Sequence, residues 1–258
     1  MSSESQRIVH AMRALGRDNL PVSFRIGADE FRLDREIKHD FFACTGFYDR
    51  TDGQQRVVLK MSRACDFCGI PLRWLGRWLC RREMRFYRKL SDLGSVPALL
   101  GTVGETGFVH AYAPGTPLSK DRPVTDQFFD DLNSLIKELH RRDIAYVDTN
   151  KPQNILHGLD DRPYLIDFQI SYDLDELGDT WLNRWLLRRL QREDFYHLLK
   201  HKRSLRPDLM SDKEIDASDR RSWFIRLHRA IATPIRKIRR RTLKRMRESG
   251  RLLPEGSK

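Results

Sequence analysis

Apolar residues recur along this 258-residue chain at two spacings, and each spacing predicts a different kind of element. Short runs rich in β-branched and aromatic residues are typical of strands, whereas apolar residues three or four positions apart are typical of one face of a helix. The predicted strands are 56–60, 107–112, 155–156 and 164–166, and the predicted helices are 81–90, 125–142 and 177–202. Strands prevail in the first part of the chain and helices in the second, which favours an α+β fold.

The segment 139–171 contains three polar side chains whose order suits phosphate transfer. Asp148 can orient and deprotonate an acceptor hydroxyl, while Asn154 and Asp167 supply the oxygen ligands that Mg²⁺ prefers. Two short apolar strands joined by the turn 157–163 separate Asn154 from Asp167, so we expect these two residues to lie side by side. Residue types and spacing together predict a site for one cation beside a general base.

This segment resembles the protein-kinase-like superfamily, in which His-Arg-Asp, a following Asn and Asp-Phe-Gly form the catalytic and metal-binding loops. The corresponding strings are Tyr146-Val147-Asp148, Asn154 and Asp167-Phe168-Gln169. Tyr replaces the His, Val replaces the Arg, and Gln replaces the Gly. The Asp-Phe-Gln triplet and a longer catalytic loop are most similar to compact bacterial kinases related to lipopolysaccharide core heptose and Kdo kinases, which in turn resemble the RIO kinases. The resemblance implies a bilobal fold, with a small β-rich N-lobe and a helical C-lobe.

The longer loop leaves two positions for the base. Asn154 lies six positions after Asp148, where five is usual, so a strict alignment on Asn154 would place Thr149 at the base position. Threonine is not a base at neutral pH, and we therefore assign the role of base to Asp148.

Two upstream residues match the phosphate-holding pair of the same superfamily. Lys60 ends the strand 56–60, and Glu83 lies beside the apolar stripe of the helix 81–90. The resemblance implies that Lys60 holds the α and β phosphates of ATP and that Glu83 orients it. Alone, each residue would be read as an ordinary surface charge. Their order ahead of Asp148, Asn154 and Asp167 supports the functional reading.

The expected glycine-rich loop is reduced to one glycine, Gly46, within 41–48. Backbone amides near Gly46 could still cover phosphates, and a plain hairpin tip is the alternative. Further along, the strand 107–112 is followed by a Pro- and Gly-containing break. The resemblance implies that this is the hinge between lobes, where the backbone around His110 and Tyr112 takes the adenine edge.

The excess positive charge of the chain is confined to its C-terminal part. Residues 220–251 contain thirteen Lys or Arg and one Glu, a net charge of +12, and the rest of the chain carries 35 basic and 35 acidic residues. Apolar residues recur there at helical spacing, so the segment predicts a basic amphipathic helix on an anionic membrane surface. Packing on the core and nucleic-acid binding are the alternatives. A smaller Trp- and Arg-containing patch at 71–79 could assist membrane contact.

Composition favours one cytoplasmic unit with an appendage. No run reaches the roughly 20 apolar residues of a membrane span, and the first 20 residues are too charged for a secretory signal. Four cysteines form no disulfide framework in a chain of this length, and Cys65 and Cys68 have metal-ligand spacing without a second ligand pair. The predicted domains are an extension at 1–20, an N-lobe at 21–109, a C-lobe at 110–215 and the tail at 216–258.

The combined pattern predicts an ATP- and Mg²⁺-dependent kinase. The resemblance and the tail favour a lipopolysaccharide-type sugar or other glycolipid as hydroxyl acceptor, at the inner face of the cytoplasmic membrane. A protein Ser/Thr acceptor and a non-catalytic pseudokinase scaffold are the alternatives. The helix 177–202 leaves little room for an activation segment, and its late basic cluster, 197–203, could bind an anionic acceptor.

Overall fold

The computed structural model describes residues 10, 12–67 and 70–219. These residues form two compact units. The first contains the described residues up to Arg82 together with Leu100–Ala111, and the second contains Glu83–Leu99 and the described residues from Tyr112 onward. The predicted tail at 216–258 lies mostly outside the described residues, and its basic segment 220–251 lies wholly outside them. The predicted domain bounds stay a prediction.

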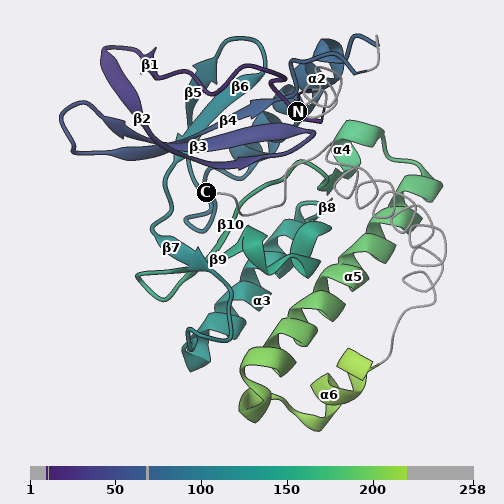
Figure 1. The fold of residues 1–258 in the computed structure, drawn as a ribbon. Helices are drawn as coiled ribbons and strands as arrows, with labels where there is room; N and C mark the ends of the chain where they lie inside the picture. Colours follow the sequence, from purple (N-terminus) through teal and green to yellow (C-terminus); the bar gives the residue numbers. More distant parts are fainter. Residues whose placement is uncertain (1–9, 11, 68–69, 220–258) are drawn as a thin grey trace, which may run out of the picture. The chain divides into compact units, whose positions relative to one another are not determined.

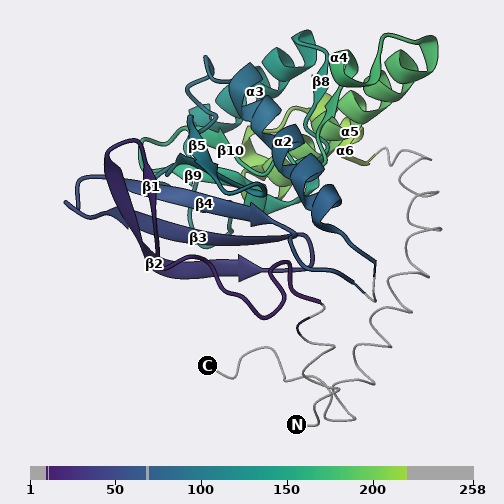
Figure 2. The same cartoon turned by 90° about the horizontal axis from the view of Figure 1, so that it is seen from above.

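The first unit is built on a six-stranded sheet with the order β1-β2-β3-β4-β6-β5 (Figures 1 and 2). Its strands are β1 (Ser23–Ile26), β2 (Asp29–His39), β3 (Ala43–Arg50), β4 (Arg56–Ser62), β5 (Leu99–Val103) and β6 (Gly107–Ala111). The strands β1 to β4 form an antiparallel meander, and β6 then pairs with β4. The predicted strands at 56–60 and 107–112 are confirmed.

The core of the first unit lies on one side of this sheet. Alternate residues of β3 are buried, as expected of a strand with one covered face. Tyr48 is fully buried, and its hydroxyl donates to the carbonyl of Pro21 at 2.6 Å. Leu15 and Leu20 join this core, so the last part of the predicted 1–20 extension packs on the sheet.

Helix α2 (Arg73–Lys89) unites the predicted helix at 81–90 with the patch at 71–79. Its residues divide between the two units after Arg82. Gly76 is required by close packing, because a Cβ there would lie 1.7 Å from the carbonyl oxygen of Arg63. Trp74 and Trp78 are more than half exposed, so these two hydrophobic residues are not core residues within the described part of the chain.

The second unit consists mainly of helices, and its described residues also form five short strands. Its elements are β7 (Gly115–Pro117), α3 (Asp126–Arg141), β8 (Ile144–Ala145), η1 (Asp148–Asn150), η2 (Pro152–Asn154), β9 (Ile155–Gly158), β10 (Pro163–Leu165), β11 (Tyr172–Asp173), α4 (Leu174–Leu177), α5 (Trp181–Leu205), η3 (Pro207–Leu209) and α6 (Asp212–Asp219). Helix α3 begins after Thr125, as predicted, and buries six apolar residues at helical spacing. The strands β7, β9 and β10 form one small sheet, and β8 pairs with β11.

Two predicted features of the second unit are confirmed with small corrections. Strands β9 and β10 form the predicted antiparallel hairpin, with Leu156 opposite Tyr164. The long helix begins at Trp181 instead of 177, because Gly178, at φ 84°, ends α4 and Thr180 caps α5 by accepting from the Asn183 amide at 3.2 Å. None of the helices in the described part of the chain has the length and apolar character that a membrane span requires.

Candidate active site

Asp148 and Asn154 are brought together in the second unit. Asp148 begins the 3₁₀ turn η1 after β8, and only 3% of it is exposed. Its Oδ2 accepts hydrogen bonds from Asn154 Nδ2 at 3.1 Å and from Lys151 Nζ at 2.7 Å. The carboxylate is therefore held in one orientation with a cation beside it. Lys151 was not singled out from the sequence, because one lysine in a polar loop has no distinguishing pattern.

The β9–β10 hairpin brings Asp167 next to Asn154. The amide of Ile166 donates to the carbonyl of Asn154 at 3.1 Å, so the residue before Asp167 is bonded directly to the metal-ligand candidate. Asp167 itself has φ 64°, in the left-handed region that Asp tolerates better than most residues. The predicted juxtaposition of the two loops thus follows from the hairpin and from this backbone bond.

The side-chain amide of Asn154 has its orientation fixed by Asp148. Because Nδ2 donates to Asp148, Oδ1 must point away from that carboxylate. An amide oxygen and the carboxylate of Asp167 are both hard oxygen donors of the kind that Mg²⁺ takes. The residues present therefore fit a Mg²⁺ ion, and the assignment of Asn154 and Asp167 as its ligands stays a prediction.

Tyr146 ties the loop that carries Asp148 to the loop that carries Asp167, and these two are called below the catalytic loop and the metal-binding loop after their predicted roles. It is fully buried, and its hydroxyl donates to the carbonyl oxygens of Ile166 and, at 3.1 Å, of Asn154. Burial, reinforced by the nearby carboxylates of Asp167 and Asp148, raises the pKa of Tyr146 well above its usual value. The tyrosine therefore remains a neutral donor at any physiological pH and can hold the two loops together.

Asp194 anchors the backbone of the catalytic loop from helix α5. It is completely buried, and its Oδ1 accepts from the Val147 amide at 2.8 Å and from Thr149 Oγ1 at 2.6 Å. Its Oδ2 accepts from the Tyr146 amide at 2.8 Å and lies 3.1 Å from His140 Nε2. The bonds hold Val147 at φ 67°, an unfavourable conformation for a β-branched residue.

Sequence reasoning missed Asp194, although a signal was present. Asp194 lies seven positions after the buried Leu187 and four before the buried Leu198, which is core spacing on a helix. An acidic residue at a core position needs partners, because burying an unpaired carboxylate is very costly. His201, later on the same helix, also supports the loop through a 2.8 Å bond between its Nε2 and the Thr149 carbonyl. Burial lowers the pKa of His201, so the ring is neutral and donates.

Phe168 fixes the start of the metal-binding loop in the core of the second unit. It is fully buried, and its ring contacts those of Phe86, Tyr87 and Tyr146 at centroid distances of 6.0, 5.3 and 5.3 Å. The Tyr87 hydroxyl also accepts from the Asp167 amide at 3.4 Å. The Phe of the Asp-Phe-Gln triplet therefore packs against α2 and the catalytic loop at the same time.

The phosphate-holding pair falls in different units. Lys60 lies on β4 opposite Thr45, with 7% of its surface exposed. Glu83 lies on α2 in the second unit and is 1% exposed. Neither is the solvated surface charge that each would be by default. Their pairing with each other and with phosphates stays a prediction.

The alternative reading of Gly46 as part of a plain hairpin tip is wrong, and phosphate contact by amides near Gly46 stays a prediction. Gly46 is an internal residue of β3, paired with Glu36 on one side and Leu59 on the other. A Cβ at this position would lie 2.5 Å from Leu20 Cδ1, so the glycine serves close packing on the core. The tip is instead formed by residues 40–42, which include no glycine. The backbone of this tip therefore lacks the conformational freedom that glycines would give it.

The amides at this tip are already bonded. Asp40 Oδ1 accepts from the Phe42 amide at 2.8 Å and from the Ala43 amide at 2.9 Å, while Lys38 Nζ lies 2.8 Å from Oδ2. These hydrogen bonds and the Lys38 charge outweigh burial and lower the pKa of Asp40. An ionised carboxylate thus occupies the donors that would otherwise be offered to an anion.

The two residues predicted to flank adenine lie at the end of β6. His110 is 6% exposed and sits opposite Val58, with its Nδ1 2.8 Å from the Ala111 carbonyl oxygen. Tyr112 follows the strand and is the first residue of the second unit after β6. The backbone here is positioned by the sheet, and its contact with adenine stays a prediction.

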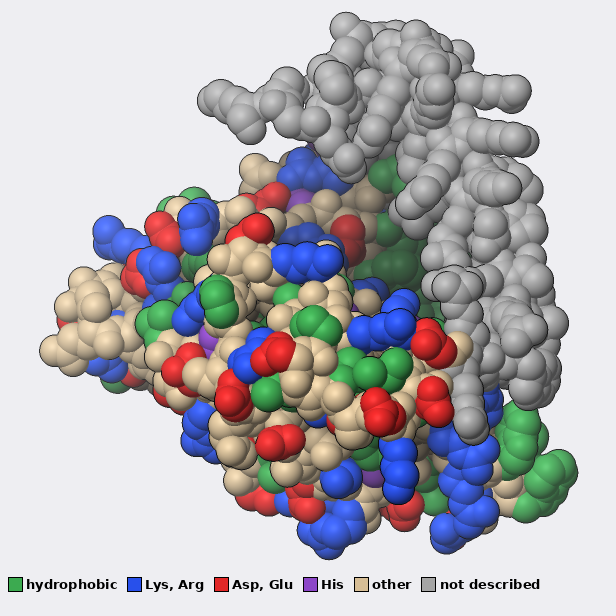
Figure 3. Space-filling view, turned by 90° about the horizontal axis from the view of Figure 1, so that it is seen from below, with side chains coloured by type: hydrophobic (Ala, Val, Ile, Leu, Met, Phe, Trp, Pro, Cys, Tyr) green, Lys and Arg blue, Asp and Glu red, His purple; other side chains and the backbone are tan. Residues whose placement is uncertain are grey.

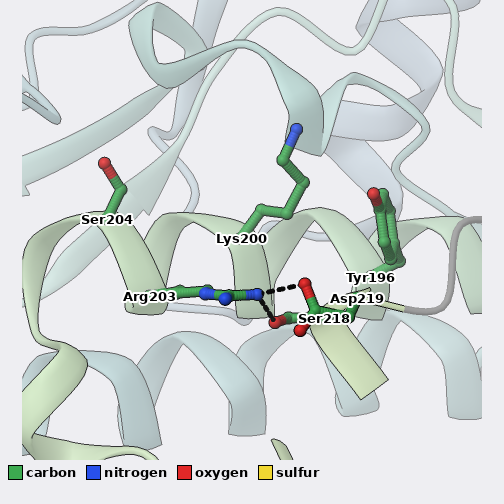
Figure 4. Close-up of a pocket in the computed structure, with 6 residues that line it drawn as sticks. All are labelled: Tyr196, Lys200, Arg203, Ser204, Ser218 and Asp219. Atoms are coloured by element: carbon green, nitrogen blue, oxygen red, sulfur yellow. Dashed lines mark hydrogen bonds and ion pairs between the residues drawn. The ribbon is translucent and has the colours of Figure 1, made fainter. Parts of the chain in front are cut away.

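The basic cluster late in α5 is partly neutralised by ion pairs. Lys202 pairs with Glu214 at 2.7 Å, Arg203 pairs with Asp219, and His201 is neutral. Figure 4 shows Arg203 directed at Asp219, whereas Lys200 points away from that pair. Lys200, Arg203 and Asp219 line a cavity of about 330 Å³ together with Tyr196, Ser204 and Ser218. Only Lys200 in this cluster keeps an unneutralised charge among the described residues, so the predicted anionic-acceptor role is not supported by the ion pairs.

A second cluster combines metal-ligand types in the first unit. Ligand atoms of Glu36, His39 and Cys44 lie within 4.8 Å of one another. The Arg13 guanidinium already stands in this cluster, with Nη2 2.7 Å from His39 Nδ1. Burial, with the bonded Glu36, raises the pKa of the Cys44 thiol, which keeps it protonated. A positive side chain and a protonated thiol both disfavour a metal ion here.

No protein-family model matches this sequence, and no curated protein matches it. Solved structures do match. The BubR1 kinase domain has a TM-score of 0.50 and 15% identity, over 71% of this chain and 64% of that one. The Rio2 kinase complex with ADP/Mg²⁺ and phosphoaspartate from Chaetomium thermophilum has a TM-score of 0.52 and 20% identity. The match covers 76% of this chain and 61% of the Rio2 chain.

These likenesses show that the chain has a protein-kinase-like fold of mixed α and β structure. The chain spans less than two thirds of the length of either structure. The predicted α+β class and kinase-like fold are therefore confirmed at this coarse level. The relation to bacterial lipopolysaccharide kinases stays a prediction.

Proposed function

We propose that this chain is an ATP-dependent phosphotransferase that transfers the γ-phosphate to a hydroxyl group. The observation that carries the proposal is the bonded pair Asp148 and Asn154. The pair lies in a buried loop whose backbone is anchored by Asp194 and joined to the Asp167 loop by Tyr146. A loop held by this many buried bonds suits catalysis, since positioning contributes much of the rate enhancement in this reaction type.

Asp148 is the general base in this proposal. The acceptor hydroxyl gives its proton to Asp148 as its oxygen forms a bond to the γ-phosphorus, and the bond from that phosphorus to the β-γ bridging oxygen breaks to release ADP. Lys151, 2.7 Å from Asp148 Oδ2, offers a positive charge beside the base, and half of its side chain is exposed. It can therefore turn toward the transferred phosphoryl group without leaving the loop.

Asn154 Oδ1 and the Asp167 carboxylate would hold Mg²⁺. Bound there, the ion would neutralise charge on the phosphate oxygens. The Rio2 structure is a complex with ADP and Mg²⁺, which supports the same cofactors for a chain of this fold. Lys60, oriented by Glu83, is the proposed ligand of the α and β phosphates, and the backbone near His110 and Tyr112 is the proposed adenine contact.

The proposed acceptor is a sugar hydroxyl on a lipopolysaccharide-type or other glycolipid. This rests on the sequence resemblance and on the basic segment 220–251, which would hold the protein at the inner face of the cytoplasmic membrane. The lack of an Arg before Asp148 removes the usual partner of an activation-loop phosphate, which favours a kinase without that switch. A protein Ser/Thr hydroxyl is the alternative acceptor.

The test is Mg²⁺-dependent formation of ADP from ATP by the purified chain, with and without a glycolipid extract. Asp148→Asn and Asp167→Asn should each lower the rate by several orders of magnitude. Asp216→Asn is the matched control, because the Asp216 side chain is exposed and makes no hydrogen bond or ion pair with the described residues. Equal rates in wild type and both active-site variants would refute the proposal. Stimulation by extracted glycolipid, absent with a peptide mixture, would support the acceptor class.

A second candidate is a non-catalytic pseudokinase scaffold. The observation that favours it is the hairpin tip 40–42, whose amides are engaged by Asp40 and which has no glycine. If wild type binds ATP but forms ADP no faster than the Asp148→Asn variant, this candidate replaces the first. Weak ATP binding together with rapid, Asp148-dependent turnover would exclude it.

A further inference from the structure

Helix α5 presents a second apolar face that lies outside the core contacts of the described residues. Its inner face is supplied by Leu187, with Leu186 and Leu190 beside it, and packs on Ala145 and Leu174. This single face is enough to dock the helix on the second unit. Other hydrophobic residues at the start of the helix lie outside that contact.

These outer hydrophobic residues form one exposed surface at the junction of α4 and α5. Trp181 is 81% exposed, Leu182 52%, and Trp185 and Leu177 are each 48% exposed. Trp181 and Trp185 are four positions apart, so they lie one above the other on the helix. Two tryptophans rarely remain this exposed in a soluble domain unless the surface has a partner.

The same stretch is uniformly basic. Residues 181–192 contain four arginines and no acidic residue. Arg184 pairs with Asp179 and Arg189 with Glu193, whereas Arg188 and Arg192 are exposed and make no ion pair with any described residue. Arg188 and Arg192 continue the row of Trp181 and Trp185 at helical steps. The outer face therefore consists of tryptophans followed by two cations that no described acidic residue neutralises.

Mixed charge prevails over most of this protein. On the face drawn in Figure 3, Lys and Arg side chains are interspersed with Asp and Glu side chains, as expected of a mixed surface. The chain outside 220–251 is balanced overall, with 35 basic and 35 acidic residues. Residues 71–82 also contain four arginines and no acidic residue, but Arg73 and Arg77 of that segment pair with Glu105.

We propose that the outer face of Trp181–Arg192 docks on the anionic surface of a lipid bilayer. Tryptophan rings prefer the boundary between headgroups and acyl chains, and arginines beside them attract phosphate headgroups. Charge distinguishes this occupant from two others. The segment 220–251, with a net charge of +12, and a second copy of the same face would both meet Arg188 and Arg192 with like charge. The inference does not depend on phosphate transfer.

The test is partition of the full-length chain onto vesicles of phosphatidylglycerol and phosphatidylcholine, compared with phosphatidylcholine alone, by co-sedimentation. Arg188→Gln with Arg192→Gln should weaken binding to the anionic vesicles about thirtyfold, from about 1 kcal/mol for each basic residue near the leaflet. Lys137→Gln with Lys213→Gln removes the same charge from exposed positions in the same unit and should change binding less than threefold.

The double variant Trp181→Ala with Trp185→Ala should weaken vesicle binding roughly tenfold for each tryptophan. Its control is Leu159→Ala, which removes an exposed apolar side chain elsewhere in the same unit, since Leu159 is 72% exposed. Light scattering without vesicles should give the same mass for every variant. Unchanged binding in both the Arg and the Trp variants would overturn the proposal and leave vesicle binding to other segments. A wild-type dimer that the Trp variant converts to a monomer would overturn it in favour of a second copy.

Discussion

The anchoring of the catalytic loop by Asp194 leads to a quantitative prediction for Asp194→Asn. Each carboxylate oxygen serves one pair of groups: Oδ1 accepts from Val147 and Thr149, and Oδ2 accepts from Tyr146 and faces His140. An amide has one oxygen and one NH₂ group, so in either orientation the NH₂ group faces the backbone amide of Val147 or of Tyr146 and that hydrogen bond is lost, whereas Thr149 Oγ1 and His140 Nε2 can accept from the NH₂ group. At roughly 1.5–3 kcal/mol for a bond to a charged group, the loop loses at least about 1.5–3 kcal/mol of anchoring, and the bonds that remain are to a neutral group.

The conformation of Val147 couples this loss of anchoring to the position of Asp148. A β-branched residue at φ 67° stores about 1–3 kcal/mol of strain, which the bonds to Asp194 now outweigh. When those bonds weaken, the loop gains by returning Val147 to an ordinary conformation, and Asp148 moves with it. A displacement of about 1 Å at a reacting group costs roughly a hundredfold in rate.

We therefore expect Asp194→Asn to lower kcat at least a hundredfold, to change the ATP dissociation constant by less than threefold, and to lower Tm. Single-turnover phosphate transfer, equilibrium ATP binding and thermal unfolding measure these three quantities. Asp216→Asn controls for loss of one charge. Val147→Gly, which removes the strain, should restore part of kcat in the Asp194→Asn background. The reasoning is refuted if Asp194→Asn keeps wild-type kcat and Tm.

Three further predictions concern single contacts. Tyr146→Phe removes the bond to the Ile166 carbonyl, so we expect a loss of about 1–2 kcal/mol in unfolding free energy and a higher Mg²⁺ concentration for half-maximal rate; an unchanged Mg²⁺ titration would contradict this. Burial lowers the pKa of His201 in the folded chain below its usual 6.5, so the unfolded chain takes up the proton first as the pH drops, and stability should fall below pH 6.5. His201→Gln keeps a donor for the Thr149 carbonyl, and its unfolding free energy, measured by chemical denaturation, should depend less on pH. Asp40→Ala frees the amides of the hairpin tip and should tighten ATP binding about tenfold by calorimetry, whereas equal affinities would show that these amides do not face the nucleotide.

The elements that the sequence predicted correctly are those with a strong local pattern. Helix α3 has six buried apolar residues at helical spacing and begins after Thr125, and the apolar spacing needs no tertiary information. The β9–β10 hairpin likewise follows from two short apolar runs and a turn, and it brings Asn154 and Asp167 into adjacent loops. Half of the candidate site was therefore accessible from local reasoning and a known order of motifs.

The position of Gly46 could not be inferred in the same way. A lone glycine between aromatic residues is compatible with a turn or with close packing in a strand. The choice depends on Leu20, which is distant in sequence and occupies the space that a Cβ would need. Packing between remote segments decided this position, and the loop at 40–42 was consequently misidentified.

The role of Asp194 could not be predicted from the sequence for a different reason. Its helix was predicted, and its core spacing was visible, but its partners lie 45 to 54 residues earlier in the chain. Only the fold brings the helix beneath the catalytic loop. Residues that act by holding a backbone in place carry no motif of their own, and they are found by asking which buried carboxylates are satisfied and by what.

The altered motifs of this chain have different consequences in the two halves of the candidate site. In the second unit, Tyr146 holds the catalytic and metal-binding loops together through its hydroxyl, so replacing the usual His does not leave these loops unconnected. In the first unit, the tip at 40–42 contains no glycine, and Asp40 engages its amides. The proposed base and cation ligands thus lie in connected loops, whereas the proposed phosphate-covering tip has its amides bonded within the chain. ATP turnover that depends on Asp148 distinguishes a catalyst from a scaffold, and ATP affinity in Asp40→Ala tests separately whether the tip limits nucleotide binding.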